Sequence, residues 1–208
     1  NIIVFMVNVA DSVMLGQYSE QALSGVALVN QIQFILQLIV TGICEGGQIF
    51  ISRAWGNRDT ATMQKTANIA MKLSLIIAFV IAVAAAIFPS QILSLLSTEQ
   101  SFVDEGTAYL KIIFVTYPIF AITTSLIVDM NSVETVKLGF YTSFITLITN
   151  ICLNYCLIYG NFGFPELGAP GAAIATTVSR ILECLAVLWY VRFRDKKLML
   201  RLKHFGRM

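Results

Sequence analysis

The chain has 208 residues, of which 57% are hydrophobic and only 12% are charged, and its formal net charge is +2. Soluble domains average roughly 45–50% apolar and about 25% charged residues. The composition therefore excludes an ordinary soluble domain and indicates a membrane protein. We expect the lipid bilayer to surround the chain and no nucleic acid to bind it.

Long apolar segments predict transmembrane helices, each of which needs about 20 largely apolar residues. In chain order they lie at about 1–15, 22–52, 66–88, 107–130, 138–160 and 169–193. The first is too short to span from residue 1, so we interpret it as the back half of a truncated helix and the chain as a fragment. Pro118 is expected to kink the fourth segment. The predicted fold class is all-α, a polytopic membrane protein with a six-helix transmembrane bundle over residues 1–193.

The loops between these segments alternate in charge. Basic side chains occupy every second loop and the tail: Arg53, Arg58, Lys65, Lys137 and the run at 194–208. Acidic side chains occupy the others: Glu20, Glu99, Asp104, Glu105 and Glu166. Because basic loops stay in the cytoplasm, we predict a multi-pass protein of the plasma (cytoplasmic) membrane with residue 1 and the basic tail inside. The outer loop at 89–106 contains SQILSLLS, which predicts a short interfacial helix.

Two aspartates lie within or at the end of apolar segments, where acids are candidates for function by default. Asp11 follows the run IIVFMV in the outer half of the first segment, with Asn8 one turn earlier on the same side. Asp11 is either a surface residue at a helix end or a buried acid kept for a purpose, and the second interpretation is favoured. Asp129 falls at the cytoplasmic end of the fourth segment, where we expect it to be exposed.

Polar side chains form a stripe along the fifth segment. Ser143, Thr146, Asn150 and Asn154 recur at three- and four-residue spacing and so share one helical face. The stripe serves either hydrogen bonding between helices or the wall of a hydrated cavity, and both interpretations stay open. The second segment carries a milder polar row of Asn30, Gln33 and Gln37.

The sixth segment also has a polar face, formed by Thr176, Arg180 and Glu183. Arg180 and Glu183 can pair at i, i+3, which lowers the cost of burying them. A structural ion pair is therefore favoured over a contact with substrate. Gly171 and Ala175 are small residues four apart, a spacing that predicts close packing against another helix.

The predicted segments show no nucleophile–base set and no metal-ligand motif of the common kinds. His204, the only histidine, lies in the basic tail, and no HExxH motif is present. Cys152 and Cys156 lie one turn apart, and we interpret them as small hydrophobic residues rather than a metal or redox pair. We therefore expect neither an enzyme nor an organic cofactor.

Three stretches resemble one known family. NVADSVMLGQYS at 8–19, GGQIFISRAWGNRD at 46–59, and NICLNYCLIYGNFGFPELGAPGAAIATTVSRILE at 150–183 are similar to the first-helix signature, second-helix end and fifth-to-sixth helix region of the multidrug and toxic compound extrusion (MATE) transporters. The resemblance implies one half of a twelve-helix transporter: the N-terminal lobe, with 194–208 as the loop to a missing C-terminal lobe. Such proteins export organic cations and other small-molecule drugs in exchange for protons or sodium ions, by alternating access.

The resemblance also implies roles for individual residues. Asp11 matches the acidic residue linked to ion coupling, and Asn150 and Asn154 match positions in the same cavity. With Asn8 these form the expected site for a proton or sodium ion, whereas Asp11, Gln33, Thr146, Asn150, Asn154 and Thr176 form the expected substrate cavity. Some members carry Asp where this chain has Asn154, which questions a mechanism with two carboxylates. Arg53, where Gln is common, and NSVETVKLG at 131–139 also depart from the family pattern.

Other functions remain as alternatives. A lipid-linked oligosaccharide flippase of the same superfamily would have a strongly cationic cavity, and only Arg180 lies well inside these helices. A membrane scaffold or a channel is compatible with the polar stripes, although no filter-like repeat is present.

Overall fold

The computed structural model describes residues 2–194, without the side chains of residues 2–5, 7 and 8. The predicted cytoplasmic tail beyond Arg194 therefore lies outside the described residues. The helices are α1 (Ile2–Tyr18), α2 (Glu20–Gly56), α3 (Thr60–Ile87), α4 (Pro89–Ser94), α5 (Gln100–Ile113), α6 (Thr116–Ser132), α7 (Lys137–Tyr159), the 3₁₀ turn η1 (Asn161–Gly163) and α8 (Ala169–Phe193). All of the described regular structure is helical.

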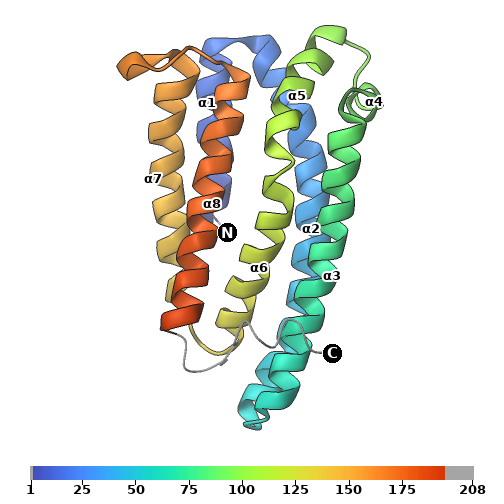
Figure 1. The fold of residues 1–208 in the computed structure, drawn as a ribbon, viewed down its shortest axis with the longest axis vertical. Helices are drawn as coiled ribbons and strands as arrows, with labels where there is room; N and C mark the ends of the chain where they lie inside the picture. Colours follow the sequence, from blue (N-terminus) through green and yellow to red (C-terminus); the bar gives the residue numbers. More distant parts are fainter. Residues whose placement is uncertain (1, 195–208) are drawn as a thin grey trace.

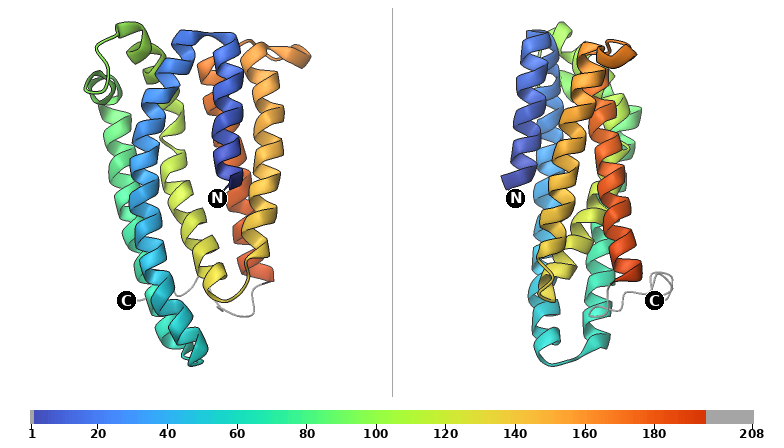
Figure 2. Two further views of the ribbon diagram at one scale, coloured as in Figure 1. Left: turned by 180° about the vertical axis from the view of Figure 1, so that it is seen from behind. Right: turned by 90° about the vertical axis from the view of Figure 1, so that its left-hand side faces the viewer.

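The helices run side by side in one bundle (Figure 1). The α2–α3 pair lies on one side and α1, α7 and α8 on the other, with α5 and α6 between them (Figure 2). The most extensive contacts are those of α7 with α8 and of α2 with α3. The α2–α3 and α6–α7 turns lie at the same end, which we call the basic end because Arg53, Arg58 and Lys137 are there.

Four helices are long and apolar enough to cross a membrane, α2, α3, α7 and α8, and α5 with α6 makes a fifth span if that bent pair is counted as one. The described part of α1 has 17 residues. The outer face of α3 exposes large apolar side chains that suit contact with lipid: Ile69, Leu73, Ile76, Phe79 and Val80. Apolar side chains on this outward-facing surface contribute to the high hydropathy of the chain.

The predicted helix at 107–130 is two helices that meet at an angle of 55°. Proline lacks an N–H, and its ring clashes with the carbonyl four residues earlier, which for Pro118 belongs to Phe114. The Phe114 carbonyl instead accepts a hydrogen bond from the Tyr117 N–H at 3.1 Å. The break therefore follows from Pro118, as expected, and α5 extends back to Gln100 beyond the apolar segment.

Capping residues fix where two long helices begin. The Ser19 side chain accepts a hydrogen bond from the Ala22 N–H at the start of α2. Asp59 accepts hydrogen bonds from the side chain and the N–H of Thr62, which hold the pKa of this carboxyl below its usual range. Because of this cap, α3 begins before the apolar run that predicted it.

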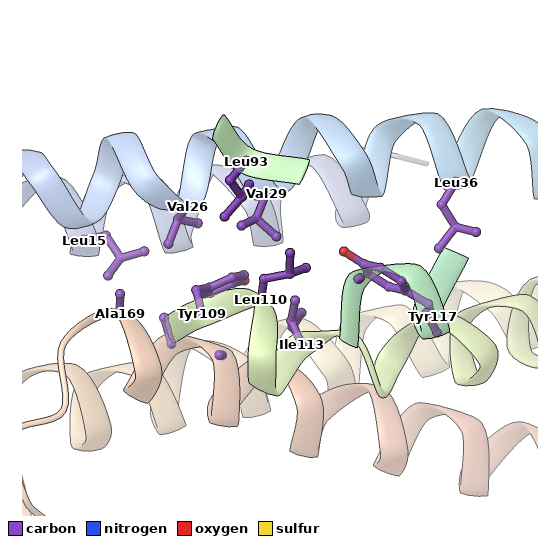
Figure 3. Close-up of a cluster of buried hydrophobic side chains, with 14 of the residues drawn as sticks. Leu15, Val26, Val29, Leu36, Leu93, Tyr109, Leu110, Ile113, Tyr117 and Ala169 are labelled. Carbon is purple, nitrogen blue, oxygen red and sulfur yellow. The ribbon is translucent and has the colours of Figure 1, made fainter. Parts of the chain in front are cut away.

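The larger core cluster has members on all eight of the described α-helices, and α2 and α5 pack against each other within it. Figure 3 shows Val26 and Val29 of α2 facing Tyr109, Leu110 and Ile113 of α5. Gly25 and Gly106 allow this approach, since a Cβ atom on Gly25 would lie 2.7 Å from the Gly106 nitrogen. The core thus holds α5 against α2, and α5 also packs against α8.

Asp129 is not exposed, contrary to the prediction. Its side chain is only 2% exposed, within α6, a helix that packs on both α2 and α3. The prediction took the end of the apolar run as the surface, but α2 and α3 continue past that level and cover it. The Oδ2 atom of Asp129 has no hydrogen-bond partner among the described residues.

Candidate functional site

Three helices place polar side chains around Asp11. Asp11 lies in the middle of α1 and is 5% exposed, so the structure favours the buried acid over the surface residue. Helix α7 contributes Asn150 and Asn154, one turn apart, and α8 contributes Thr176. All of these side chains are buried. We call Asp11, Asn150, Asn154 and Thr176 the Asp11 cluster.

The members of the Asp11 cluster are joined in a closed hydrogen-bond ring. The Asn154 side-chain N–H donates to Oδ1 of Asp11 and to Oδ1 of Asn150, the latter at 3.2 Å. The Thr176 hydroxyl donates to Oδ2 of Asp11 at 3.3 Å. Asn150 donates to the Thr176 oxygen at 3.1 Å, which closes the ring. Each carboxylate oxygen of Asp11 therefore accepts from a neutral donor on a different helix.

The charge of Asp11 is not neutralised by a direct partner. Among the described residues, the one salt bridge joins Arg180 and Glu183. Burying a carboxylate without a counter-charge is expensive, even when neutral groups donate hydrogen bonds to it. Oδ1 of Asn154 is buried beside this carboxylate and has no hydrogen-bond partner among the described residues. Carboxylate and amide oxygens are the ligands that hard cations prefer, so the cluster fits either a proton on Asp11 or a small cation beside it.

Tyr109 is a member of this environment that the sequence did not reveal. It is buried on α5, and its phenol interacts with both Asp11 and Thr176. In the sequence, a tyrosine among apolar residues indicates only a core residue. The connection of Tyr109 with Asp11 depends on the packing of α5 against α8.

The other predicted site residues lie apart from this ring. Thr146 is buried but donates to the Thr142 carbonyl of its own helix at 2.9 Å. Gln33 is half-buried on α2 and takes no part in the hydrogen bonds that the described residues of the Asp11 cluster make. Asn8 lies on α1, and its side chain is outside the described residues. Ser143, at the other end of the polar stripe, donates to Glu183 at 3.5 Å.

A separate cavity of about 220 Å³ lies nearer the basic end, between α2, α6, α7 and α8. Polar side chains dominate its lining: Gln37, Thr41, Glu45, Gln48, Thr123, Asn131, Ser143, Arg180 and Glu183. Drug-sized ligands occupy pockets of about 300–1,000 Å³, so this inner cavity is too small for one by itself. The stripe on α7 thus fits both interpretations that the sequence left open. Asn150 and Asn154 form hydrogen bonds between helices, and Ser143 lines the wall of the inner cavity.

Comparison with known proteins identifies the family. The MatE family profile matches residues 1–156. The chain belongs to the MatE family. It is 27% identical over 201 residues to the probable multidrug resistance protein NorM of Thermotoga maritima, covering 97% of this chain and 43% of that protein. It is 30% identical over 165 residues to the probable multidrug resistance protein YoeA of Bacillus subtilis, covering 79% of this chain and 36% of that protein.

Solved MATE structures share the fold. An inward-facing multidrug resistance MATE family transporter of the MOP superfamily superimposes with a TM-score of 0.87 at 20% identity, over 98% of this chain and 46% of the other. An outward-facing structure of such a transporter gives 0.86 at 20% identity, over 99% and 45%. The chain spans less than half the length of the relatives it matches. The MatE assignment confirms the resemblance, and the solved MATE structures confirm the all-helical membrane fold.

Proposed function

We propose that the chain is the N-terminal lobe of a multidrug efflux transporter, which exchanges drugs or organic cations for protons or sodium ions. Its relatives are named as probable multidrug resistance proteins, and solved MATE transporters of the same fold include inward- and outward-facing forms. A lobe of this size supplies one wall of a central cavity, so a C-terminal lobe is the proposed partner. The basic end would face the cytoplasm, as the loop charges favour.

The observation that carries this proposal is the Asp11 cluster. A buried carboxylate bonded to neutral donors, with no ion pair among the described residues, costs free energy until a positive charge joins it. A proton on Asp11, or a sodium ion held by Asp11 and the Asn154 carbonyl oxygen, supplies that charge. An organic cation in the central cavity supplies it as well.

Exchange follows because drug and ion stabilise the same carboxylate in turn. If the outward-facing state admits the ion and the inward-facing state admits the drug, each ligand shifts the population toward the state it binds better. Asn150 and Thr176 would orient the Asp11 carboxylate in both states through the ring. The chain's own residues thus hold the positive charge and position it, while the proposed C-terminal lobe completes the cavity.

The test is drug efflux from cells that express the full-length protein with its natural flanking sequence. D11N keeps the size of the side chain and removes its negative charge. We expect D11N to abolish ion-driven efflux, and the matched change E20Q, at an exposed acid at the start of α2, to leave it intact. Efflux by D11N at the wild-type rate would contradict the role of Asp11.

A lipid-linked oligosaccharide flippase is less well supported. Such a cavity should present free basic groups to an anionic lipid carrier. Within residues 2–194, Arg180 is the one buried basic side chain, and Glu183 neutralises it. A scaffold or channel would not require a buried acid ringed by donors.

A further inference from the structure

Helix α8 connects the Asp11 cluster to the inner cavity through one row of side chains. Thr176 contacts Asp11, and Arg180 follows one turn later on the same face, about 6 Å along the axis at 1.5 Å per residue. Glu183 follows Arg180 and lines the inner cavity with it. A positive charge therefore lies between two carboxylates, Asp11 on one side and Glu183 on the other.

In the structure Arg180 is bound to Glu183. The Nη1 atom of Arg180 lies 2.9 Å from Oε2 of Glu183, and Arg180 is 6% exposed. The guanidinium also lies over the Phe120 ring, 5.8 Å from its centre. Ser143 donates to the other oxygen of Glu183 at 3.5 Å. Arg180 of α8 and Ser143 of α7 thus hold the Glu183 carboxylate beside the inner cavity, and Phe120 of α6 contacts the guanidinium.

Arg180 nevertheless lies one helical turn after Thr176, whose hydroxyl donates to Asp11. Its charge interacts with the Asp11 carboxyl even in this paired position. Helical side chains lean toward the N-terminus of their own helix, which for Arg180 is the direction of Thr176 and Asp11. Arg180 lines the inner cavity, so its long side chain is not enclosed by packed atoms on every side. A guanidinium keeps its charge at any physiological pH, so its position decides which carboxylate it neutralises.

We propose that Arg180 is a tethered counter-charge for Asp11 that Glu183 holds back. While Glu183 binds the guanidinium, Asp11 is left for the coupling ion or an organic cation. When that cation leaves, Arg180 swings toward Asp11 and keeps the buried carboxylate neutralised. Arg180 is thus a positioning residue that competes with the transported cations. This inference rests on the proposed function only for the identity of the cation that competes with Arg180 for Asp11. The competition of Asp11 and Glu183 for the Arg180 guanidinium is a property of this lobe.

The experiment is a double-mutant cycle on thermal stability of the purified full-length protein. In E183Q the freed Arg180 pairs with Asp11, so we expect a melting temperature within about 2 °C of wild type, the shift that less than about 1 kcal/mol produces. In D11N/E183Q the guanidinium is buried with neither partner. We expect that variant to melt roughly 5–10 °C below the sum of the single effects, as breaking a buried pair does. E45Q, at the exposed acid in the lining of the same cavity, is the matched control and should be additive with D11N.

A second comparison separates a mobile Arg180 from a fixed structural pair. Adding R180Q to D11N/E183Q removes the unpaired charge, so we expect the lost melting temperature to return. The proposal is overturned if E183Q alone destabilises as much as D11N/E183Q, since Arg180 would then have no second partner. These outcomes do not depend on efflux. If D11N transports normally while the cycle is non-additive, the proposed function fails and the Arg180 tether stands.

Discussion

Gly171 sets how closely α8 approaches α7, and replacing it tests whether that distance builds the Asp11 cluster. A Cβ atom at this position would lie 2.5 Å from the Leu157 carbonyl oxygen and 2.8 Å from its carbon, both backbone atoms of α7. To restore ordinary contact near 3.4 Å, the helices must separate by about 0.9 Å, the difference of the two distances. The hydrogen bond from Asn150 to Thr176, now 3.1 Å, would then lengthen to about 4 Å and break.

The cost of G171A follows from these shifts. Overpacking of a tight contact typically costs about 1–3 kcal/mol. Gly-to-Ala in a helix interior returns up to about 1 kcal/mol. We expect a net loss of about 1–2 kcal/mol, or a melting temperature lower by about 2–8 °C at about 2–4 °C per kcal/mol. The assay is a thermal melt of the full-length protein in detergent.

Gly42 provides the matched control for this change. It is an exposed helical glycine on α2, and a Cβ atom there would meet no atom within 4 Å. G42A should therefore leave the melting temperature unchanged or raise it by a few degrees, at most about 4 °C. If G171A melts at the same temperature as G42A, Gly171 does not set the distance between α7 and α8, and the Asp11 cluster does not depend on it.

Three further changes test other parts of the structure. N154D places a second carboxylate beside Asp11, and adjacent carboxylates cannot both stay ionised without a cation. Sodium chloride should therefore raise the melting temperature of N154D more than that of wild type. An equal response of the two proteins would argue against a cation site there. D129N puts a neutral isostere in place of a buried acid whose Oδ2 has no hydrogen-bond partner among the described residues. The melting temperature of D129N should therefore equal or exceed that of wild type. A loss of stability of about 3–5 kcal/mol, the size expected for a broken buried ion pair, would reveal a partner of Asp129. P118A gives the Phe114 carbonyl a helical N–H donor, so amide hydrogen exchange around the α5–α6 break should slow. Unchanged exchange would show that the 55° bend does not depend on the proline.

The helices of this protein were predictable from its sequence because apolar length is a strong signal in a membrane protein. Pro118 also predicted the kink, and Gly171 the close packing of α8. The SQILSLLS stretch predicted the short helix that the structure shows as α4. Each of these features depends on residues that act locally or on one face of one helix.

The candidate site was predictable only in part. Asp11, Asn150 and Asn154 were identified, but the ring they form with Thr176 depends on how α1, α7 and α8 meet. Tyr109 was missed because its role comes from packing between helices distant in sequence. Gln33 and Thr146 lie outside this ring, so their place in the substrate cavity stays a prediction. Asp129 was misplaced because the ends of apolar runs do not show how far neighbouring helices extend.

The central claim is that Asp11 couples the movement of an ion to the movement of a drug. Its most direct test is transport by the purified full-length protein in liposomes, where an imposed proton or sodium gradient drives movement of a fluorescent organic cation. We expect gradient-driven movement by wild type and E20Q and none by D11N. Gradient-driven movement by D11N at the wild-type rate would contradict it.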